Sequence, residues 1–283
     1  MSNIIDEIEK VVKGKREKIE LILAVFFAGG HILLEDIPGV GKTTIAKTIS
    51  EVLGLTFTRV QFTSDLLPSD ILGINYFDME QKNFILKKGP IFTEILLVDE
   101  INRAMPKTQS ALLESMEEKQ VTLDKVSYSL SDNFFVIATQ NPLEEVGTFP
   151  LPISQLDRFM ASISIGYPSK EAEKLILKRQ FIVLNSFKNE VEELKKKDIF
   201  VDDKIIDLIL KITQFSRSGI FEYGLSTRAA LALLNLSKGW ALIKNRDFVI
   251  DEDVMEVLPY VIKHRLTPID KEMDILNAIK LAL

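Results

Sequence analysis

Seven consecutive residues decide the fold of this chain: Pro38-Gly39-Val40-Gly41-Lys42-Thr43-Thr44. They follow the apolar run at residues 31–34 and precede a helical pattern at residues 45–49, so they join a strand to a helix. Glycines let backbone N–H groups curl around phosphate oxygens, and the helix adds the positive end of its dipole. We expect Lys42 to reach the β- and γ-phosphates of ATP and the Thr43 hydroxyl to bind Mg²⁺. The stretch therefore predicts a P-loop.

One position departs from the usual P-loop pattern, because Asp36 stands where the first glycine is expected. Aspartate tolerates left-handed backbone angles better than most residues, so we expect the turn to survive. Its carboxylate should point away from the triphosphate, since it would otherwise weaken binding. The alternative is a glycine-rich turn before a helix. Gly-x-Gly-Lys-Thr arises by composition alone in roughly one chain of this size in a hundred, and the strand–loop–helix context favours phosphate binding.

A pair of acids, Asp99 and Glu100, follows the apolar run at residues 95–98. A buried strand that ends in two acids places both at the carboxyl edge of the sheet, where open α/β sheets bind ligands. Asp99 suits a role in holding Mg²⁺, and Glu100 suits activation of the water that attacks the γ-phosphate. The alternative, a strand followed by a solvated acidic turn, is less favoured downstream of a P-loop.

A third polar group ends the apolar run at residues 134–139, where Gln140, Asn141 and Pro142 follow. The Asn141 amide has the chemistry to hydrogen-bond the attacking water or the γ-phosphate. Alone, an Asn-Pro after a strand usually indicates only a turn. Its weight comes from its place in the order of motifs.

The chain changes character near Gly166. Before it, apolar runs alternate with helical patterns, as βα units do, and their continuous apolarity predicts parallel strands covered on both faces. After it, Asp202, Ser226 and Asp251 are predicted helix caps, and Pro259 is expected to kink or interrupt the third helix. We expect an α/β domain over residues 1–165 and a helical domain over residues 166–283. The apolar runs lie at residues 31–34, 58–62, 95–98, 134–139 and 161–165.

Two hairpins are predicted within the first domain. One encloses the polar residues 78–83 between Tyr76-Phe77 and residues 84–86. The other turns at Asp124-Lys125, where alternating apolar and serine residues at 126–130 indicate a half-exposed strand. A type I′ turn there would put lysine at φ > 0, where glycine is usual, which weakens that turn assignment.

Composition narrows the function classes. The 283 residues are 46% hydrophobic, which allows a sizeable core, and contain no cysteine, which excludes disulfides, thiolate zinc sites and cysteine nucleophiles. A net charge of −6 argues against nonspecific binding to nucleic-acid backbones as the main role. Neither a secretory signal nor an apolar run of about 20 residues is visible, so the expectation is a soluble, cytoplasmic protein. The two histidines, His31 and His264, suit structural roles.

Taken together, the motifs resemble those of the MoxR family of AAA+ ATPases. The P-loop alone indicates only an NTPase, whereas the ordered set with two hairpins is specific and covers essentially the whole chain. In order, the motifs are Pro-Gly-Val-Gly-Lys-Thr-Thr (38–44), Leu-Leu-Val-Asp-Glu-Ile-Asn-Arg-Ala (96–104), Lys-Thr-Gln-Ser-Ala-Leu-Leu-Glu-Ser-Met-Glu-Glu (107–118), Phe-Val-Ile-Ala-Thr-Gln-Asn-Pro (135–142) and Gln-Leu-Asp-Arg-Phe (155–159).

The resemblance implies a five-stranded parallel sheet followed by a helical lid, and a ring, commonly hexameric, with ATP bound between neighbours. It places Gly14 near the adenine, with Lys15 where the family often has glutamine. It implies that Asn141 is sensor 1, that Arg158 is the arginine finger reaching a neighbour's γ-phosphate, and that Arg228 is sensor 2 from the lid. The hairpins match a helix-2 insert and a pre-sensor-1 hairpin, which in related ATPases face the pore and contact what is being remodelled.

The arginine roles also have physical support, because a guanidinium that spreads transition-state charge accelerates phosphoryl transfer by about three to five orders of magnitude. Without the resemblance, simpler roles are favoured: Arg158 pairing with Asp157 or Glu144, and Arg228 on an ordinary helix surface. Arg103 resembles a family position without an assignable role. The nominated residues are Gly14, Pro38, Gly39, Val40, Gly41, Lys42, Thr43 and Thr44 for nucleotide, Thr43 and Asp99 for Mg²⁺, and Lys42, Glu100, Asn141, Arg158 and Arg228 for catalysis.

Three functions compete at this stage. The favoured one is chaperone-like, in which ATP hydrolysis remodels or activates a protein partner; by resemblance, such partners often carry a von Willebrand factor A domain. The second is a nucleic-acid translocase, against which the acidic balance weighs. The third is a nucleotide-gated scaffold with negligible turnover, which would not need Glu100 as a base.

Overall fold

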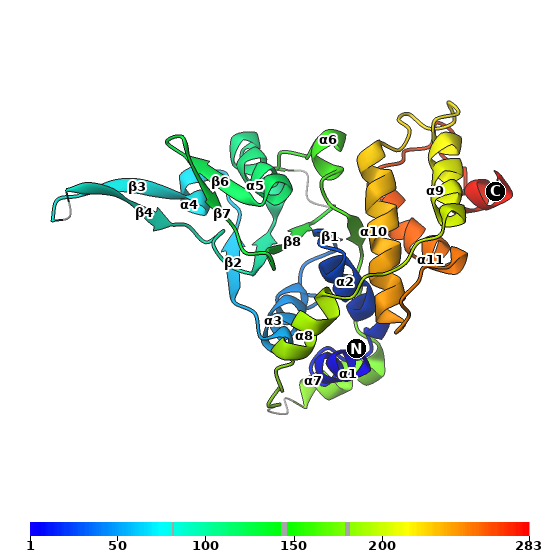
Figure 1. The fold of residues 1–283 in the computed structure, drawn as a ribbon, viewed down its shortest axis with the longest axis horizontal. Coiled ribbons are helices and arrows are strands. Elements are labelled where there is room, and N and C mark those ends of the chain that lie inside the picture. Colours follow the sequence, from blue (N-terminus) through cyan, green and yellow to red (C-terminus); the bar gives the residue numbers. More distant parts are fainter. Residues whose placement is uncertain (81, 143–145, 179–181, 283) are drawn as a thin grey trace.

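A central parallel sheet organises the chain, which a computed structural model describes at residues 1–80, 82–142, 146–178 and 182–282 (Figure 1). The strands lie in the order β2-β5-β8-β1-β9, and every neighbouring pair is parallel. The expected five-stranded sheet is confirmed, with strand ends displaced by only about one or two residues. The strands are β1 (Ile32–Glu35), β2 (Phe57–Gln61), β5 (Ile95–Asp99), β8 (Phe135–Gln140) and β9 (Ala161–Ile163).

Successive residues of the inner strands face two separate apolar cores. Leu33, Leu96 and Val136 pack on one face with α5 (Pro106–Glu118). The residues between them pack on the other face with the N-terminal helices and the later helices of the chain. Because helices cover both faces, these strands are apolar up to the polar residues at their carboxyl ends, as expected. The helices in the first half of the chain are α1 (Ser2–Glu9), α2 (Arg16–Phe27), α3 (Lys42–Leu53), α4 (Pro68–Leu72), the 3₁₀ helix η1 (Ile101–Arg103), α5 and α6 (Ile153–Leu156).

Strand β2 is an exception to this coverage. It lies at the edge of the sheet with β5 as its single neighbour, and its side chains are half-buried or exposed. The expected coverage of both faces is therefore only partial for this strand, in which Phe57 and Val60 pack against the two cores. Because they are exposed, Arg59 and Gln61 can form hydrogen bonds to polar groups at the end of β5.

Both predicted hairpins are present. Strands β3 (Gly73–Asp78) and β4 (Asn83–Lys88) form a long antiparallel ribbon that projects away from the rest of the molecule (Figure 1). Strands β6 (Gln120–Leu123) and β7 (Val126–Ser129) turn at Asp124 and Lys125, whose φ values are 50° and 69°. The I′-like turn thus forms with lysine in the left-handed region. Asn75 Nδ2 donates to Asp124 Oδ2 at 2.9 Å and links the two hairpins.

The second half of the chain is helical, and two of its three predicted caps are confirmed. Asp202 accepts from the backbone N–H of Lys204, and Ser226 accepts from that of Ala229. Asp251 was wrong, because it is the first helical residue, and Asp253 two residues later accepts from the N–H of Ile250. The helices are α7 (Lys170–Leu177), α8 (Lys188–Lys195), α9 (Asp203–Ser216), α10 (Thr227–Ile243), α11 (Asp251–Ile262) and α12 (Ile275–Ala282).

The helical half is fastened to the sheet at several points. Helix α11 continues past Pro259, so this proline does not end it. A Cβ built on Gly239 of α10 would lie 2.2 Å from the carbonyl oxygen of Ala24, so these two helices approach too closely for any other residue. Helix α8 packs on α3.

The division at residue 165 stays a prediction. Within the described residues, no helix has both the length and the apolarity needed to cross a membrane.

Candidate functional site

The phosphate loop lies between β1 and α3, at the carboxyl edge of the sheet. Gly39 and Gly41 have φ values of 84° and 91°, in the left-handed region that side chains rarely adopt. Apart from the glycines' own and adjacent residues, no described atom lies within 4 Å of a Cβ built on either glycine, so their surroundings are open. Helix α3 starts at Lys42, directly after Gly41, and Thr43 is its second residue. Its unpaired N–H groups therefore face this open space, which fits a bound anion. Of the other loop residues, Val40 is buried, and Pro38 and Thr44 are exposed.

Lys42 occupies the centre of this edge. Its Nζ donates to the backbone oxygen of Asp36 at 2.8 Å. Burial lowers the pKa of Lys42, and the charges of Asp36, Asp99 and Glu100 oppose that shift. Strands β1, β8 and β5 are parallel neighbours, so the loop that follows β1 and the acids at the end of β5 lie at the same edge. The structure therefore brings the phosphate loop and the acidic pair together at one edge of the sheet.

Asp99 ends strand β5 and is buried there. Its Oδ2 accepts from Arg59 Nε on the edge strand at 2.6 Å. Its Oδ1 lies 3.4 Å from the Thr139 hydroxyl of β8. Both carboxylate oxygens thus have partners that fix the side chain. A carboxylate oxygen fixed in this way suits a hard cation such as Mg²⁺.

Glu100 follows Asp99 with φ 57°, an uncommon conformation for a residue that is not glycine. Its backbone N–H donates to the Thr139 hydroxyl at 3.0 Å, which holds the turn in place. Its Oε2 accepts from Gln61 Nε2 at 2.6 Å and pairs with Arg103 Nε at 2.9 Å. In this conformation two cationic or polar neighbours therefore orient the carboxylate. Arg103, which had no role from the sequence, is one of them.

Asn141 follows strand β8, which lies between the strands of the two preceding motifs. Gln140 is in register with Glu35 of β1, and its carbonyl oxygen accepts from the backbone N–H of Asp36 at 3.3 Å. Asn141 is therefore placed beside the start of the phosphate loop. The three motifs that the sequence singled out share one edge.

Gly14 lies beside α7. It has φ 66°, and a Cβ built on it would lie 3.5 Å from the Ala172 Cβ. The next residue, Lys15, donates from Nζ to the carbonyl oxygens of Ile165 and Tyr167 at 2.8 and 2.7 Å. The N-terminal segment nominated for the adenine thus contacts the chain that follows β9.

The guanidinium groups of Arg158 and Arg228 both contact the carboxylate of Glu117. Arg158 Nη1 lies 3.2 Å from Glu117 Oε2, and the Arg228 guanidinium contacts Glu117 Oε1. Arg228 Nη1 also lies 3.9 Å from Asp157 Oδ2. Three elements thus meet here: the end of α5, the α6–β9 connection and the start of α10. Asp157 takes part in this arrangement, but it pairs with Arg228 and Arg265 and shows no ion pair with Arg158. Glu144, the other partner considered for Arg158, lies outside the described residues.

The arginine pair lies at the amino edge of the sheet, opposite the phosphate loop. Arg158 precedes β9, and Met160 donates its backbone N–H to the carbonyl oxygen of His31, which precedes β1, at 2.8 Å. Strands β1 and β9 are parallel, so their amino ends share one edge. The four residues of β1 alone span about 13 Å. The structure therefore does not bring Arg158 and Arg228 to the phosphate loop of their own chain.

Arg265 fastens the helical half to this amino edge. It is 5% exposed, and its Nε donates to Asp157 Oδ1 at 2.6 Å. Its remaining donors contact the carbonyl oxygens of Asp157, Phe159, Met160 and Val261. Burial lowers the pKa of Arg265, and Asp157 opposes the shift. Nothing in its local sequence distinguishes this arginine, and sequence reasoning missed it.

Sequence reasoning also missed Arg59, Gln61, Thr139 and Glu117. A signal existed for the first two, because alternation along the predicted strand at residues 58–62 places them on the same side, toward the end of β5. Glu117 lies inside one of the quoted motifs, but only the tertiary structure shows that it holds both arginines.

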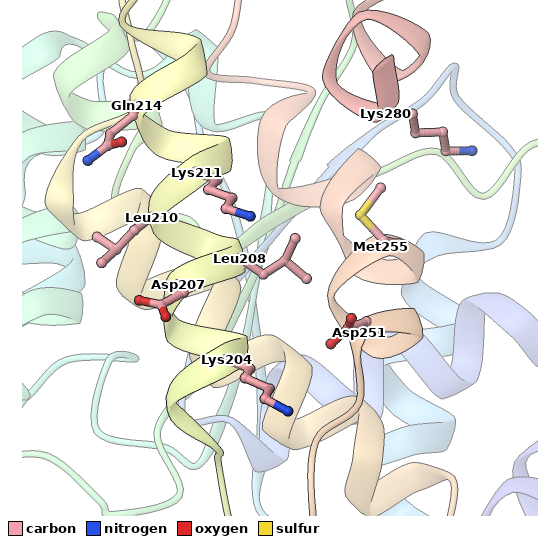
Figure 2. A pocket seen from close by; sticks show the side chains of 9 residues that line it. All are labelled: Lys204, Asp207, Leu208, Leu210, Lys211, Gln214, Asp251, Met255 and Lys280. Carbon is pink, nitrogen blue, oxygen red and sulfur yellow. The ribbon is translucent and has the colours of Figure 1, made fainter. Parts of the chain in front are cut away.

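A groove of about 720 Å³ lies elsewhere, on the helical half between α9, α11 and α12 (Figure 2). Lysines and aspartates surround a floor that includes Leu208 and Met255. None of the residues nominated from the sequence lines it. The groove is therefore separate from the phosphate loop.

The chain is similar to known proteins along most of its length. Residues 31–161 match the ATPase family associated with various cellular activities (AAA), and residues 217–279 match the AAA lid domain. The chain is 40% identical to YeaC of Bacillus subtilis, over 94% of this chain and 86% of YeaC. It is 37% identical to the chaperone MoxR1 of Mycobacterium tuberculosis, over 94% of this chain and 75% of MoxR1. A crystal structure of a Cytophaga hutchinsonii protein described as an ATPase superposes with a TM-score of 0.89 at 37% identity, covering 100% of this chain and 93% of that one.

Proposed function

The chain belongs to the MoxR family of AAA+ ATPases, and on that premise we propose that it hydrolyses ATP between neighbouring subunits of a ring to remodel or activate a protein client. The observation that carries the proposal is the division of the nominated residues between two edges of the sheet. Lys42, Asp99 and Glu100 lie at the carboxyl edge, whereas Arg158 and Arg228 lie at the amino edge. One copy of the chain thus has both halves of a site that it cannot assemble alone.

A second copy of the chain supplies the missing half. When the amino edge of one subunit faces the carboxyl edge of the next, the arginine pair approaches the neighbour's phosphate loop. Such a head-to-tail contact is heterologous and generates a closed ring when the rotation between subunits closes, commonly with six members in this family. The two arginines and Glu117 are 27%, 43% and 40% exposed, so their ion pairs are weak, about 0–1 kcal/mol each. The arginines can therefore leave Glu117 for a phosphate at little cost.

Within the composite site each residue has a defined task. The N–H groups of the phosphate loop and Lys42 hold the triphosphate, and Gly14 lies on the side proposed for adenine. Thr43 and Asp99 would hold Mg²⁺, which neutralises charge on the β- and γ-phosphate oxygens. Glu100 accepts a proton from the attacking water. Asn141 orients that water.

Charge development at the γ-phosphate is stabilised from the neighbouring subunit. Arg158 and Arg228 would place guanidinium donors against the phosphate oxygens, where planar N–H groups match their geometry. Once they have left Glu117 for the phosphate oxygens, the two guanidinium groups stabilise the charge that develops in the transition state. A subunit without a neighbour lacks this contribution and should turn over slowly.

The ribbon β3–β4 is the proposed client-binding element. Its exposed apolar side chains are unusual for a polar surface, and Phe77 and Phe84 stack edge to face at 5.3 Å near its end. In a ring, such ribbons would face the pore, and aromatic and aliphatic groups there would bind extended or partly unfolded segments of a protein. A client with a von Willebrand factor A domain is the proposed class. The exposed residues are Ile74 (47%), Tyr76 (45%), Phe77 (48%), Met79 (79%) and Phe84 (66%).

The dependence of turnover on protein concentration tests the proposal. Since a complete site needs two copies, ATP hydrolysis per chain should rise with protein concentration and reach a plateau when rings are formed. Lys42→Ala protein should show no turnover at any concentration and excludes a contaminating ATPase. Turnover per chain that stays constant down to concentrations where sedimentation shows only monomer would contradict the composite site.

A further inference from the structure

The carboxylate of Asp36, the residue that replaces the first glycine of the P-loop pattern, is fully engaged. It accepts from Ser164 Oγ at 2.7 Å, from the backbone N–H of Ile165 at 2.5 Å and from that of Gly166 at 3.1 Å. Asp36 is 5% exposed. All three donors belong to residues 164–167, here called the linker, which leave β9 and lead toward α7. The side chain therefore faces away from the open side of the phosphate loop, as expected from its charge.

The linker is held from a second direction by Lys15, whose Nζ donates to the carbonyl oxygens of Ile165 and Tyr167. Asp36 thus accepts hydrogen bonds from the N–H groups of the linker, and Lys15 donates hydrogen bonds to its carbonyl oxygens. Backbone groups outside regular structure need such partners when they are buried. The side chains of Asp36 and Lys15 therefore fix a segment that no helix or strand stabilises.

The backbone of Asp36 links this contact to the phosphate-binding lysine. Its carbonyl oxygen accepts from Lys42 Nζ at 2.8 Å, and its N–H donates to the carbonyl oxygen of Gln140 at the end of β8. When Lys42 turns toward a phosphate, the first of these bonds is exchanged for one to the ligand. The carbonyl group that loses this bond and the carboxylate that holds the linker both belong to Asp36.

We propose that Asp36 is a positioning residue that couples the phosphate loop to the linker, so that occupation of Lys42 by phosphate sets the position of residues 164–167. This inference rests on the proposed function, because it assumes that Lys42 binds the triphosphate. A glycine at position 36 would permit the turn but would leave the N–H groups of Ile165 and Gly166 without their acceptor. The carboxylate is thus present for the linker, and the loop tolerates it because it is turned away from the ligand.

Asp36→Gly, which restores the usual P-loop glycine, is the direct test. The variant should bind ATP with a KM within about threefold of the wild type, while kcat falls about tenfold or more because the linker is misplaced. Hydrogen exchange at the amides of Ile165 and Gly166 should accelerate about tenfold or more. ADP should slow exchange at these amides in the wild type and leave them unprotected in the variant, although the phosphate-loop amides remain protected in both.

Two further variants keep the test decisive. Ser164→Ala removes one donor but leaves both backbone contacts, so kcat should stay within about twofold of the wild type. Asp36→Asn keeps an acceptor for Ile165 but sets its NH₂ group against the N–H of Gly166, so its kcat should lie between those of wild type and Asp36→Gly. If Asp36→Gly does not fold, Asp36→Asn decides, with lower kcat, unchanged KM and faster exchange at Gly166 expected.

Wild-type kcat and wild-type exchange in Asp36→Gly, or in Asp36→Asn if only that variant folds, would overturn the assignment. Loss of ATP binding in the variant would overturn it as well, since the residue would then shape the phosphate loop itself. Failure of the proposed function looks different: the wild type would neither hydrolyse ATP nor show slower exchange of its phosphate-loop amides with ADP.

Discussion

The two edges of the sheet carry the two halves of the proposed site, and they are built in different ways. At the carboxyl edge, each polar group ends or directly follows the strand that places it, as Asp99 ends β5 and Asn141 follows β8. At the amino edge, Arg158 and Arg228 are 70 positions apart in sequence and meet only because Glu117 of a third element binds both. Chemistry at a strand end is therefore local in the sequence, whereas chemistry between elements depends on the whole fold.

The two edges also differ in how firmly their groups are held. Asp99 is buried, with both oxygens engaged, and Glu100 is held by three neighbours. The arginines are partly exposed and share a carboxylate that is itself 40% exposed. The carboxyl edge is thus preorganised, and the amino edge is ready to exchange partners. This difference is what a site completed by another subunit requires.

Removal of Arg158 should have the largest effect. In Arg158→Ala, ATP hydrolysis should fall by about three to five orders of magnitude, because the neighbour's γ-phosphate loses its guanidinium. ATP binding to the variant should be unchanged, because the phosphate loop lies at the other edge. Fluorescent-nucleotide binding and steady-state hydrolysis measure the two properties. Lys211→Ala removes a charge from the exposed surface of α9 and should leave ATP binding and hydrolysis unchanged. Weaker ATP binding in Arg158→Ala would contradict the assignment of binding and arginine function to different edges.

Glu100→Gln alters the other edge and should have the next largest effect. The amide keeps the size of the side chain but accepts no proton, so hydrolysis should fall by about two to four orders of magnitude while ATP binding persists. Single-turnover hydrolysis with prebound ATP separates the two steps. Unchanged turnover would exclude Glu100 as the base.

Mild acid should lower the free energy of unfolding, because two buried histidines lie at the amino edge of the sheet. His31 Nε2 donates to the Met116 carbonyl oxygen at 3.1 Å, and its Nδ1 accepts from the backbone N–H of Val136 at 3.0 Å. Burial lowers the pKa of His31 to about 4 and that of His264 well below its usual value. Since the unfolded chain takes up these protons first, stability is complete above about pH 6.5 and declines as the pH falls toward 4.

Urea unfolding at pH 7.5 and 5.5 measures this effect, which should be about 1.4 kcal/mol for each histidine. His31→Gln, which keeps a donor and an acceptor without a titrating ring, should reduce the difference between the two pH values. Equal stability of the wild type at both pH values would show that the histidines do not control it.

Glu117→Ala should have the smallest effect. The ion pairs that it removes are exposed, so the free energy of unfolding should change by no more than about 1 kcal/mol, and hydrolysis by no more than about threefold. Thermal unfolding and steady-state hydrolysis provide the measurements. A loss of hydrolysis as large as that in Arg158→Ala would mean that Glu117 belongs to the reacting site and is not only a resting partner.

Sequence alone predicted the strands, both hairpins and the residues at the carboxyl edge, because each depends on a local pattern. The cap at Asp251 was wrong because three acids in a row compete for that position, and Asp253 has the reach to the N–H of Ile250. The coverage of β2 is only partial because strand order, and hence the edge position, is not encoded in the strand itself.

The parts of the site that sequence could not predict are contacts between distant elements. Arg265 binds four carbonyl oxygens and Asp157, but its local sequence is that of an ordinary helix end. Asp36 was identified as a departure from the pattern, yet its partners lie 128 to 130 positions away. Such contacts follow from the parallel pairing of β1 with β9, which brings the two segments together.

The central claim, that both arginines complete a site in another subunit, is tested most directly by mixing inactive variants. Lys42→Ala should regain roughly a quarter of the wild-type rate when mixed in equal amounts with Arg158→Ala, and also with Arg228→Ala, because some interfaces then combine an intact phosphate loop with an intact arginine pair. A mixture of Arg158→Ala with Arg228→Ala should stay inactive, since every arginine pair lacks one member. Recovery in this last mixture, or no recovery in the first two, would contradict the account.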